Sequence, residues 1–460
     1  MIYAPYLPVK KLLPLLLVVP LLGFSLVSLG SKELDKNLVE TAGEEVKATT
    51  DLSLLGPGGD PSVLFSLVKL GGVVFVDQTT KRLPWIATAG MLVNASPEEC
   101  WKVATDFTTY TSFMPQVDSV APSPQGDFIE QVTWTLGFKV AIIPFSLTYS
   151  LRYYHRPPYR TDWTAIGGGI KKNNGYYEFV PVKGGKGTIF LNASYSEPRS
   201  GFLQWAFKQN PDLELATNLS ANLVQVNVIK RRIESLLGRE EVATEVPNEL
   251  SIRSMSLDLG TLGDLCSKGV LIIVEKHREG KPVYVTVGTT FNAPIDEVWK
   301  QITSYQDYPY YLPMVERASV VKTYEGGAEI NFKLDMKIVL FDYMLDYNLD
   351  HRFDKPHRIT WTETEGNIKG VAGSWELVPL GSDKTLGFYR STSDYRSLGW
   401  LVRYMLKQEP TFDDSIQASV ATGMMRNMKR WIEMSEAERE KLRKKGQKIR
   451  REKGEDFYKF

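Results

Sequence analysis

Alternating apolar and polar residues mark the clearest predicted strands of this chain. From Ile330 to Ile338 every second residue is apolar, and the residues between them are charged or carry an amide. The alternation resumes from Tyr343 to Leu349. A period of two sends successive side chains to opposite faces of a sheet, so one face meets water and the other meets an apolar layer. Several such segments follow one another with short turns, which predicts an antiparallel meander rather than β-α-β units.

The alternation occurs twice because the chain contains an internal duplication. Residues of the same kind recur 198 positions apart, as in Trp101 and Trp299 or Trp163 and Trp361, and the strand parity is kept. One offset held over such a length indicates two copies of a unit of about 180 residues. We therefore expect two independent domains with superimposable cores. The first change of spacing, to 199, is expected near 198–208.

Each copy is expected to open with two strands, Gly72–Gln78 and Trp85–Val93 in the first copy, which are followed by a short helix, and to close with a long helix. In the first copy Asn94 and Ser96 are suited to cap the short helix, and Pro97 suits its first turn. Long helices with an apolar stripe start after Asn210 and after Pro410. This order of elements predicts a curved antiparallel sheet with one long helix across its concave face.

The remaining segments set the expected boundaries. Lys10 and Lys11 precede an apolar run from Leu12 to Leu29, a pattern typical of a signal peptide or signal anchor. It predicts an exported protein, periplasmic or extracytoplasmic, or one anchored to a membrane by this segment. The C-terminal residues 435–460 carry an excess of Lys and Arg. This basic tail is interpreted as a solubilising extension, with contact to a membrane or a partner as the alternative. The expected division is 1–30 signal segment, 31–62 linker, 63–238 first domain, 239–262 linker, 263–434 second domain and 435–460 charged tail.

Composition excludes several classes of function. A formal net charge of +1 provides no general field for binding nucleic acid. Cys100 and Cys266 each stand where the other copy has valine, which predicts buried apolar positions. The four histidines show no metal-ligand spacing, so neither a metal nor another cofactor is expected. The sequence also lacks a nucleophile elbow and a phosphate-binding glycine loop.

Two segments resemble a known superfamily. Residues 366–379, GNIKGVAGSWELVP, are similar to the Gly-x-(Ile/Phe)-Lys…Gly-x-Trp-x-Leu-x-Pro segment of START-like proteins, in the branch of polyketide cyclases/dehydrases and coenzyme Q-binding proteins. Residues 169–181 are the counterpart in the first copy, which departs from the family at Tyr110-Thr111, where the second copy has Tyr308-Pro309. The resemblance covers about 71–234 and 269–433.

This resemblance implies an α+β protein of two tandem helix-grip (START-like) domains. In such a domain a curved antiparallel sheet surrounds a long C-terminal helix, with a deep apolar cavity between them. Members bind lipids, sterols, quinones or polyketides, and a minority catalyse cyclisation or dehydration of the bound chain. The fold alone therefore implies a hydrophobic ligand and leaves the chemistry open.

Large side chains expected on the concave face are candidate walls of the cavity. The candidate ligand-binding residues are Trp134, Phe145, Tyr149, Trp163, Phe332, Tyr343, Tyr347, Trp361, Met424 and Met428. The candidate residues of the cavity mouth, which precede the closing helices, are Phe202, Trp205, Trp400 and Tyr404. For any single member, packing in the core is the alternative interpretation, and the prediction rests on the set.

These patterns predict a protein that binds a hydrophobic small molecule and is suited to transport it, with membrane contact at the mouth. Tyr347 and Trp361 are expected to border a volume on the order of 300–1,000 Å³. One alternative is a didomain polyketide aromatase/cyclase, in which Tyr149 or Tyr347 would act. Another is an interaction protein whose cavities have closed.

Overall fold

The computed structural model describes residues 61–77, 87–140, 143–182, 187–198, 211–239, 251–252, 257–275, 283–338, 341–400, 402–403 and 411–452. The predicted signal segment and almost all of the first predicted linker lie outside these ranges. Within them, none of the helices combines the length and the apolar character needed to cross a bilayer.

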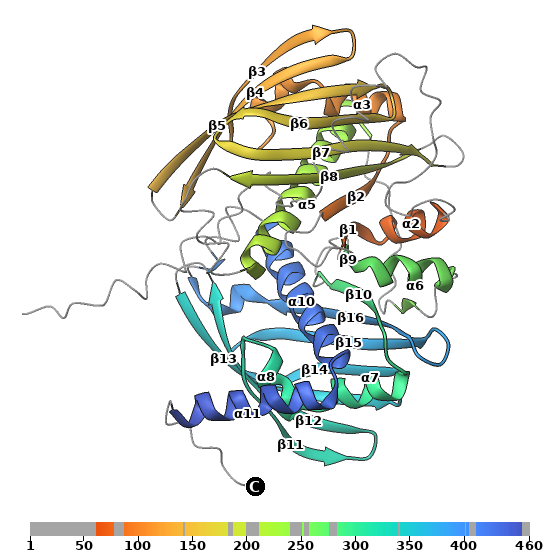
Figure 1. The fold of residues 1–460 in the computed structure, drawn as a ribbon, viewed down its shortest axis with the longest axis vertical. Coiled ribbons are helices and arrows are strands. Elements are labelled where there is room, and N and C mark those ends of the chain that lie inside the picture. Colours follow the sequence, from red (N-terminus) through yellow and green to blue (C-terminus); the bar gives the residue numbers. More distant parts are fainter. Residues whose placement is uncertain are drawn as a thin grey trace, which may run out of the picture.

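The two repeats share the same succession of strands and main helices, and the second contains α8, η5 and α11 in addition (Figure 1). The first repeat consists of α2 (Pro61–Val68), β1 (Gly71–Asp77), β2 (Ala87–Val93), α3 (Pro97–Ala104), η2 (Phe107–Ser112), β3 (Val117–Gly126), β4 (Ile129–Val140), β5 (Ile143–Arg156), β6 (Arg160–Gly168), β7 (Ile170–Pro181), β8 (Thr188–Pro198) and α5 (Pro211–Leu236). The second consists of α6 (Leu259–Lys268), β9 (Gly269–Glu275), β10 (Val285–Phe291), α7 (Ile295–Ile302), η4 (Tyr305–Asp307), α8 (Tyr308–Tyr311), β11 (Val315–Tyr324), β12 (Gly327–Ile338), β13 (Phe341–Asp354), β14 (Arg358–Gly366), β15 (Lys369–Pro379), β16 (Thr385–Asp394), η5 (Tyr395–Leu398), α10 (Thr411–Ile432) and α11 (Glu436–Glu452).

The predicted antiparallel meander and closing helix are confirmed in both repeats. Strands β3 to β8 pair in sequence, and β11 to β16 do the same. The short helix α3 begins as expected: Ser96 accepts a hydrogen bond from the Glu99 amide, and Glu99 accepts one from the Ser96 amide. Ser96 is the N-cap residue. The backbone N–H of Asn94 donates to Glu234 of α5, which ties the start of α3 to the end of the long helix.

The expectation of independent domains is wrong, because all the described strands form one 16-stranded sheet. Its order is β11-β12-β13-β14-β15-β16-β10-β9-β1-β2-β8-β7-β6-β5-β4-β3, so the strand order is the same in both halves, read outward from β1 and β9. Strands β1 and β9 pair antiparallel along their whole length. Val74 is opposite Ile272, which is its own counterpart 198 positions later, so a local two-fold axis passes through this pair.

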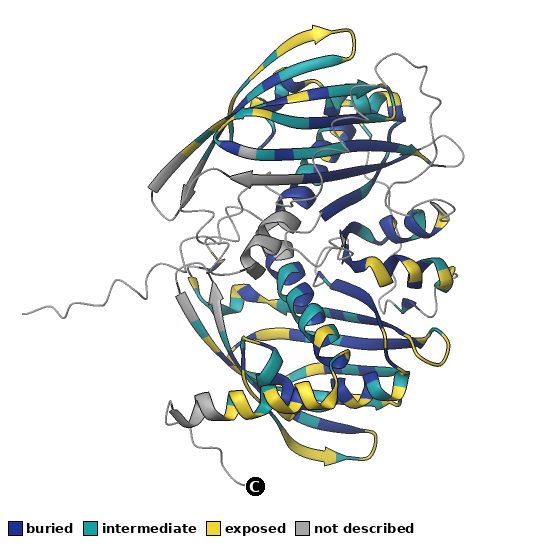
Figure 2. Ribbon diagram, in the orientation of Figure 1, coloured by how far each residue is buried: buried dark blue, intermediate teal, exposed yellow. Residues whose placement is uncertain are grey.

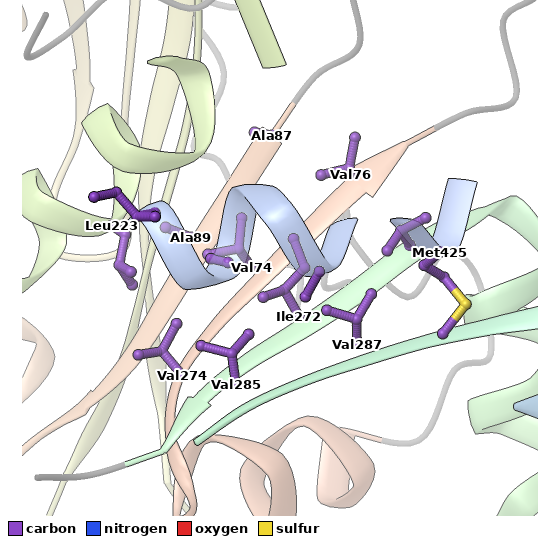
Figure 3. Packing of buried hydrophobic residues seen from close by; sticks show 14 of the residues in the cluster. Val74, Val76, Ala87, Ala89, Leu223, Ile272, Val274, Val285, Val287 and Met425 are labelled. Carbon is purple, nitrogen blue, oxygen red and sulfur yellow. The ribbon is translucent and has the colours of Figure 1, made fainter. Parts of the chain in front are cut away.

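The junction forms because β1 and β9 are apolar on both faces. Their sequences, GGVVFVD and GVLIIVE, do not alternate, as is typical of strands covered on both sides. On one face Val74 and Ile272 belong to a single core cluster that also includes Val226 of α5 and Met425 of α10 (Figure 3). On the other face, apolar residues of α2 and α6 pack against the two strands and form a second core cluster with them. Figure 2 shows β9 and β10 in the colour of buried residues, and each of their residues is buried.

Two glycines allow the close approach of β1 and β9. A Cβ built on Gly71 would lie 1.9 Å from the carbonyl oxygen of Val274, and one on Gly269 would lie 2.0 Å from that of Val76. Both distances are far below van der Waals contact. Gly71 and Gly269 are counterparts in the two repeats, so the same requirement applies at each end of the junction.

The spacing of the repeats changes earlier than expected. Thr188 donates to the carbonyl of Ala95, and Thr385 donates to the carbonyl of Ala293. The two threonines are therefore equivalent, although they are 197 positions apart rather than 198. The reason is the turn before these strands: it closes from Val182 to Gly187 in the first repeat and over one residue fewer, from Leu380 to Lys384, in the second.

Two segments outside the predicted domains are also structured. Helix α6 begins at Leu259, inside the range expected to be linker. Helix α11 occupies much of the expected solubilising tail, and one of its faces is packed against the protein. The guanidinium of Arg443 donates two hydrogen bonds to Asp307, and Arg439 is buried and donates to Glu297. The interpretation as a plain solvated tail is therefore wrong for this face.

Candidate functional site

A cavity of about 60 Å³ lies in the first repeat, between the concave face of the sheet and α5. Strands β4 to β8 provide most of its wall, and the segment after η2 closes one side. The lining residues are Tyr110, Met114, Pro115, Val117, Trp134, Leu136, Tyr149, Leu151, Tyr153, Trp163, Asn173, Tyr177, Ser194, Ala221 and Gln225. The cavity can hold water but is smaller than the several hundred Å³ typical of a small-molecule pocket.

Strand register brings the aromatic residues of the wall together. Trp134 of β4 is directly opposite Tyr149 of β5, and Tyr153 is opposite Trp163 of β6. Tyr110 packs against Trp134 with ring centroids 5.3 Å apart, and its hydroxyl donates to the carbonyl of Ala104. Rings fixed in this way provide broad apolar surfaces of defined orientation.

A polar network crosses the cavity from the sheet to the closing helix. The side-chain amide of Gln225 on α5 donates to the hydroxyl of Tyr177 at 2.8 Å. Asn192 donates to the Gln225 side-chain oxygen at 2.7 Å, and Ser194 donates to Asn222 at 2.8 Å. A further bond, of 2.9 Å, joins the indole N–H of Trp163 to Asn173. The network fixes α5 to the sheet and gives an otherwise aromatic cavity several hydrogen-bonding groups.

None of the described side chains that line the cavity is charged. Burial raises the pKa of Tyr149, Tyr153 and Tyr177 above the usual range, so their hydroxyls stay protonated at neutral pH. They can donate or accept hydrogen bonds but are poor general bases. The cavity is therefore suited to a neutral molecule with a hydroxyl, carbonyl or amide group.

The equivalent positions of the second repeat have lost this network. Tyr177 pairs with Asn192 across β7 and β8, and the corresponding pair across β15 and β16 is Trp375 with Tyr389. Equivalent positions of the two long helices are 199 positions apart, because the backbone N–H groups of Asn94 and Asn292 donate to Glu234 and Glu433. On this spacing Met424 replaces Gln225 and Ala421 replaces Asn222, and on the strand spacing of 198 Val371 replaces Asn173. The two repeats thus differ at several of the positions that carry polar groups in the first cavity.

The structure brings three of the predicted ligand-binding residues into the cavity lining: Trp134, Tyr149 and Trp163. Phe145 lies on β5 opposite Phe138, and its side chain is outside the described set. The predicted residues of the second repeat belong to, or pack against, the main core cluster: Phe332, Tyr343, Tyr347, Trp361, Met424 and Met428. Tyr347 stacks on Phe332 at 5.9 Å, and the sulfur of Met428 accepts a hydrogen bond from Tyr311.

Of the predicted mouth residues, Trp400 follows η5 and is 76% exposed. Phe202, Trp205 and Tyr404 lie outside the described residues. Cys100 and Cys266 are buried and unpaired, as expected, and burial raises the pKa of each thiol to about 12. Among the described residues, no group of histidine, cysteine or acidic side chains is arranged to hold a metal ion.

Sequence reasoning missed the cavity residues Tyr153, Tyr177 and Gln225. The signal for Tyr153 was present, because it continues the same-face series of Tyr149 and Leu151 on β5. Gln225 was missed because the buried face of a helix is recognised in a sequence by its apolar residues, and this residue of that face is polar. Only the structure shows that it faces Tyr177 and Asn192.

A curved antiparallel sheet that packs around a long C-terminal helix, with an aromatic cavity between them, defines a helix-grip protein. Here the sheet and its closing helix occur twice in tandem, and the cavity is described in the first repeat.

The family model described as "Polyketide cyclase / dehydrase and lipid transport" matches residues 93–221 and 291–430, together more than half of the chain. The protein therefore belongs to this START-like family. One similar solved structure is a STAR-related lipid transfer protein of Xanthomonas axonopodis, with 13% identity, a TM-score of 0.30 and coverage of 36% of this chain and 94% of that one. Another is the di-domain aromatase/cyclase BexL of the BE-7585A biosynthetic pathway, with 11% identity, a TM-score of 0.22 and coverage of 74% and 97%. Comparison with curated protein sequences gave no match.

Proposed function

We propose that the first repeat binds a neutral hydrophobic molecule that carries at least one hydroxyl, carbonyl or amide group. The observation that carries the proposal is the hydrogen-bonded pair of Tyr177 and Gln225, which Asn192 supports from behind, in the wall of a cavity whose other residues are mainly aromatic and aliphatic. Aromatic walls remove apolar ligand surface from water, and a few placed polar groups orient the ligand. Membership of a family of hydrophobic-ligand proteins supports the same conclusion.

Binding requires the cavity to enlarge. At about 60 Å³ it is several times smaller than a typical small-molecule pocket. The contacts that hold it closed are the hydrogen bonds between α5 and the sheet, so a ligand that replaces the partners of Gln225 would release the helix at little cost. When ligand is bound, we expect the backbone amides of β7 and β8 to exchange their hydrogens more slowly. We also expect the exchange rates of the amides of α5 to change.

The direct test is native mass spectrometry of molecules that co-purify with the full chain. Gln225→Leu removes the central group of the network and should lower ligand occupancy roughly three- to tenfold, the effect of losing one hydrogen bond. Met424→Leu is the matched control, because Met424 occupies the same helical position in the second repeat. Equal occupancy in both variants would count against the first cavity as the binding site. A bound molecule released in cyclised or dehydrated form would favour the aromatase/cyclase alternative over a carrier.

We further propose that the protein is exported or membrane-tethered and delivers its ligand at a membrane surface. The apolar run from Leu12 to Leu29 and the exposed indole of Trp400 support this proposal. Transfer between donor and acceptor vesicles should slow in Trp400→Ala. Phe128→Ala is the control, since Phe128 is also exposed but lies at the remote turn between β3 and β4. Unchanged transfer in Trp400→Ala would exclude this residue from membrane contact.

A further inference from the structure

We propose that β11, one of the two edge strands of the sheet, pairs with β11 of a second copy of this chain. The two strands run antiparallel, and a two-fold axis lies at Ser319. The sheets of the two copies then join into one, and the protein is a dimer. This interface lies at the outer edge of the second repeat, so it is independent of the first cavity and of the ligand proposed for it.

The two edges of the sheet differ in their protection against further pairing. Strand β3 ends the sheet in the first repeat and β11 ends it in the second, at opposite ends of the molecule (Figure 1). Strand β3 carries Pro122 and Pro124. The equivalent residues of β11, 198 positions later, are Val320 and Lys322. Proline has no N–H to donate to a neighbouring strand, so it blocks an edge. Of the two edges, β11 is the one able to accept a strand.

The hydrogen-bond pattern shows which backbone groups of β11 face outward. The backbone N–H of Asp335 donates to the carbonyl of Met314, which fixes the alternation of hydrogen-bonded and non-hydrogen-bonded pairs along β11 and β12. On this alternation Ala318 and Val320 are in non-hydrogen-bonded pairs, so their N–H and C=O groups point away from β12. Pro122 agrees with the assignment, because proline fits an edge strand where the missing N–H would face outward. Among the described residues, no strand pairs with this side of β11.

Two adjacent valines are exposed at the same edge. Val320 is 49% exposed, and Val321, the extra residue of a β-bulge, is 53% exposed. Strand β3 also contains bulges, so bulging does not distinguish the two edges. Pairing with another strand would remove part of this apolar surface from water, and β-branched residues are favoured in paired strands.

The outward backbone groups match those of a second copy. With the axis at Ser319, Ala318 of one copy is opposite Val320 of the other, and each pair exchanges N–H···O=C bonds in the antiparallel pattern. Each residue with outward-facing groups thus meets another such residue. Because β3 is blocked by its prolines, the chain has one edge to offer, and assembly stops at two copies instead of growing into a filament.

Charge complementarity favours this register and a second copy as the partner. Glu316 precedes Ser319 by three positions and Lys322 follows it by three, so Glu316 of each copy is opposite Lys322 of the other. Both side chains lie on one face of the sheet, because Glu316 is 3.5 Å from Lys333 and Lys322 is 3.0 Å from Glu329, and the latter two are alternate residues of β12. Opposite charges that face each other across two strands stabilise the pairing.

The test is sedimentation equilibrium of the full chain over a range of concentrations. Wild type should show a monomer–dimer equilibrium with a Kd on the order of 10–100 μM, since one pair of strands buries little surface. Val320→Pro gives β11 the residue that β3 carries at this position. It should therefore keep the fold and weaken dimerisation at least about tenfold.

Val320→Thr is the matched control, because threonine keeps both the N–H and the β-branched shape. Its Kd should stay within about threefold of that of wild type. Equal dimerisation of Val320→Pro and Val320→Thr would overturn the proposal. A wild type that remains monomeric up to about 1 mM would also overturn it and leave the edge to an extended segment of another protein.

A charge exchange tests the register and does not depend on the proline variant. Glu316→Lys and Lys322→Glu should each weaken dimerisation about three- to tenfold, because like charges then face each other across the axis. The double variant should return to within about twofold of the wild-type Kd, since it restores the opposite charges. A double variant that dimerises no more strongly than the single variants would overturn the proposal.

Discussion

The junction of β1 and β9 makes a quantitative prediction about Gly71→Ala. The added Cβ would lie 1.9 Å from the carbonyl oxygen of Val274, and the backbone of Gly71 has a φ of 157°, which alanine rarely adopts. The two strands must separate at this end. Loss of one or two buried hydrogen bonds at about 1 kcal/mol each, with about 1–2 kcal/mol of backbone strain, gives a loss of about 3 kcal/mol. Gly269→Ala should have a smaller effect of about 1–2 kcal/mol at the other end of the junction, because its φ of −177° is extended and adds no backbone strain.

The control is Gly126→Ala, since a Cβ at Gly126 meets no atom within 4 Å. Its effect should stay within about 0.5 kcal/mol. The assay is urea denaturation followed by ¹⁹F NMR of fluorinated tryptophans, with Trp163 reporting on the first repeat and Trp375 on the second. Both signals should move together to lower urea in Gly71→Ala, because one core cluster spans the two repeats. A shift confined to the signals of the first repeat would refute the reasoning and restore the interpretation as independent domains.

Three further predictions concern charge, the C-terminal helix and the cavity. Burial lowers the pKa of His155 to about 4 and of His351 to about 3, so the unfolded chain takes up protons first as the pH falls below 6.5. The free energy of unfolding should therefore fall by about 1.4 kcal/mol per pH unit for each histidine until these pKa values are reached, and a flat profile in urea titrations would contradict the pKa shifts. Arg443→Ala should release α11 to proteolysis while Lys444→Ala, at an exposed neighbour, should not; equal cleavage would contradict the packing of α11. Ala221→Leu should fill the first cavity and abolish ligand retention with a change in stability below about 1.5 kcal/mol, as measured by native mass spectrometry and urea denaturation.

Periodicity was sufficient to predict the strands, their antiparallel order and the side of the sheet that faces the helix. Trp134 and Tyr149 were assigned to the concave face from alternation alone, and both line the cavity. Alternation cannot give register, however, so it could not show that Tyr153 is opposite Trp163. It also could not find Gln225, whose role depends on two partners more than 30 positions earlier in the chain.

The junction was missed for a different reason. The apolar sequences of β1 and β9 were read as ordinary opening strands of two separate domains. A strand that is apolar at nearly every position is expected to be buried on both faces. In a single domain of this kind, a strand at the edge of the sheet would be covered on one face only. That excess of apolar residues was the available signal. The offset of the repeats could not reveal it, because two separate copies and two joined copies have the same offset.

The two-fold axis through Val74 and Ile272 bears on how the two repeats came to differ. In an assembly of two identical chains joined in this way, position 74 would contact itself, and any substitution in one cavity would appear in both. Within a single chain each half mutates separately while the shared sheet keeps them together. Val74 and Ile272 already differ, as do Gln225 and Met424 or Tyr153 and His351. Covalent linkage thus removes the symmetry constraint on the sequence and leaves the geometry of the interface in place, so each repeat is free to change its interior separately.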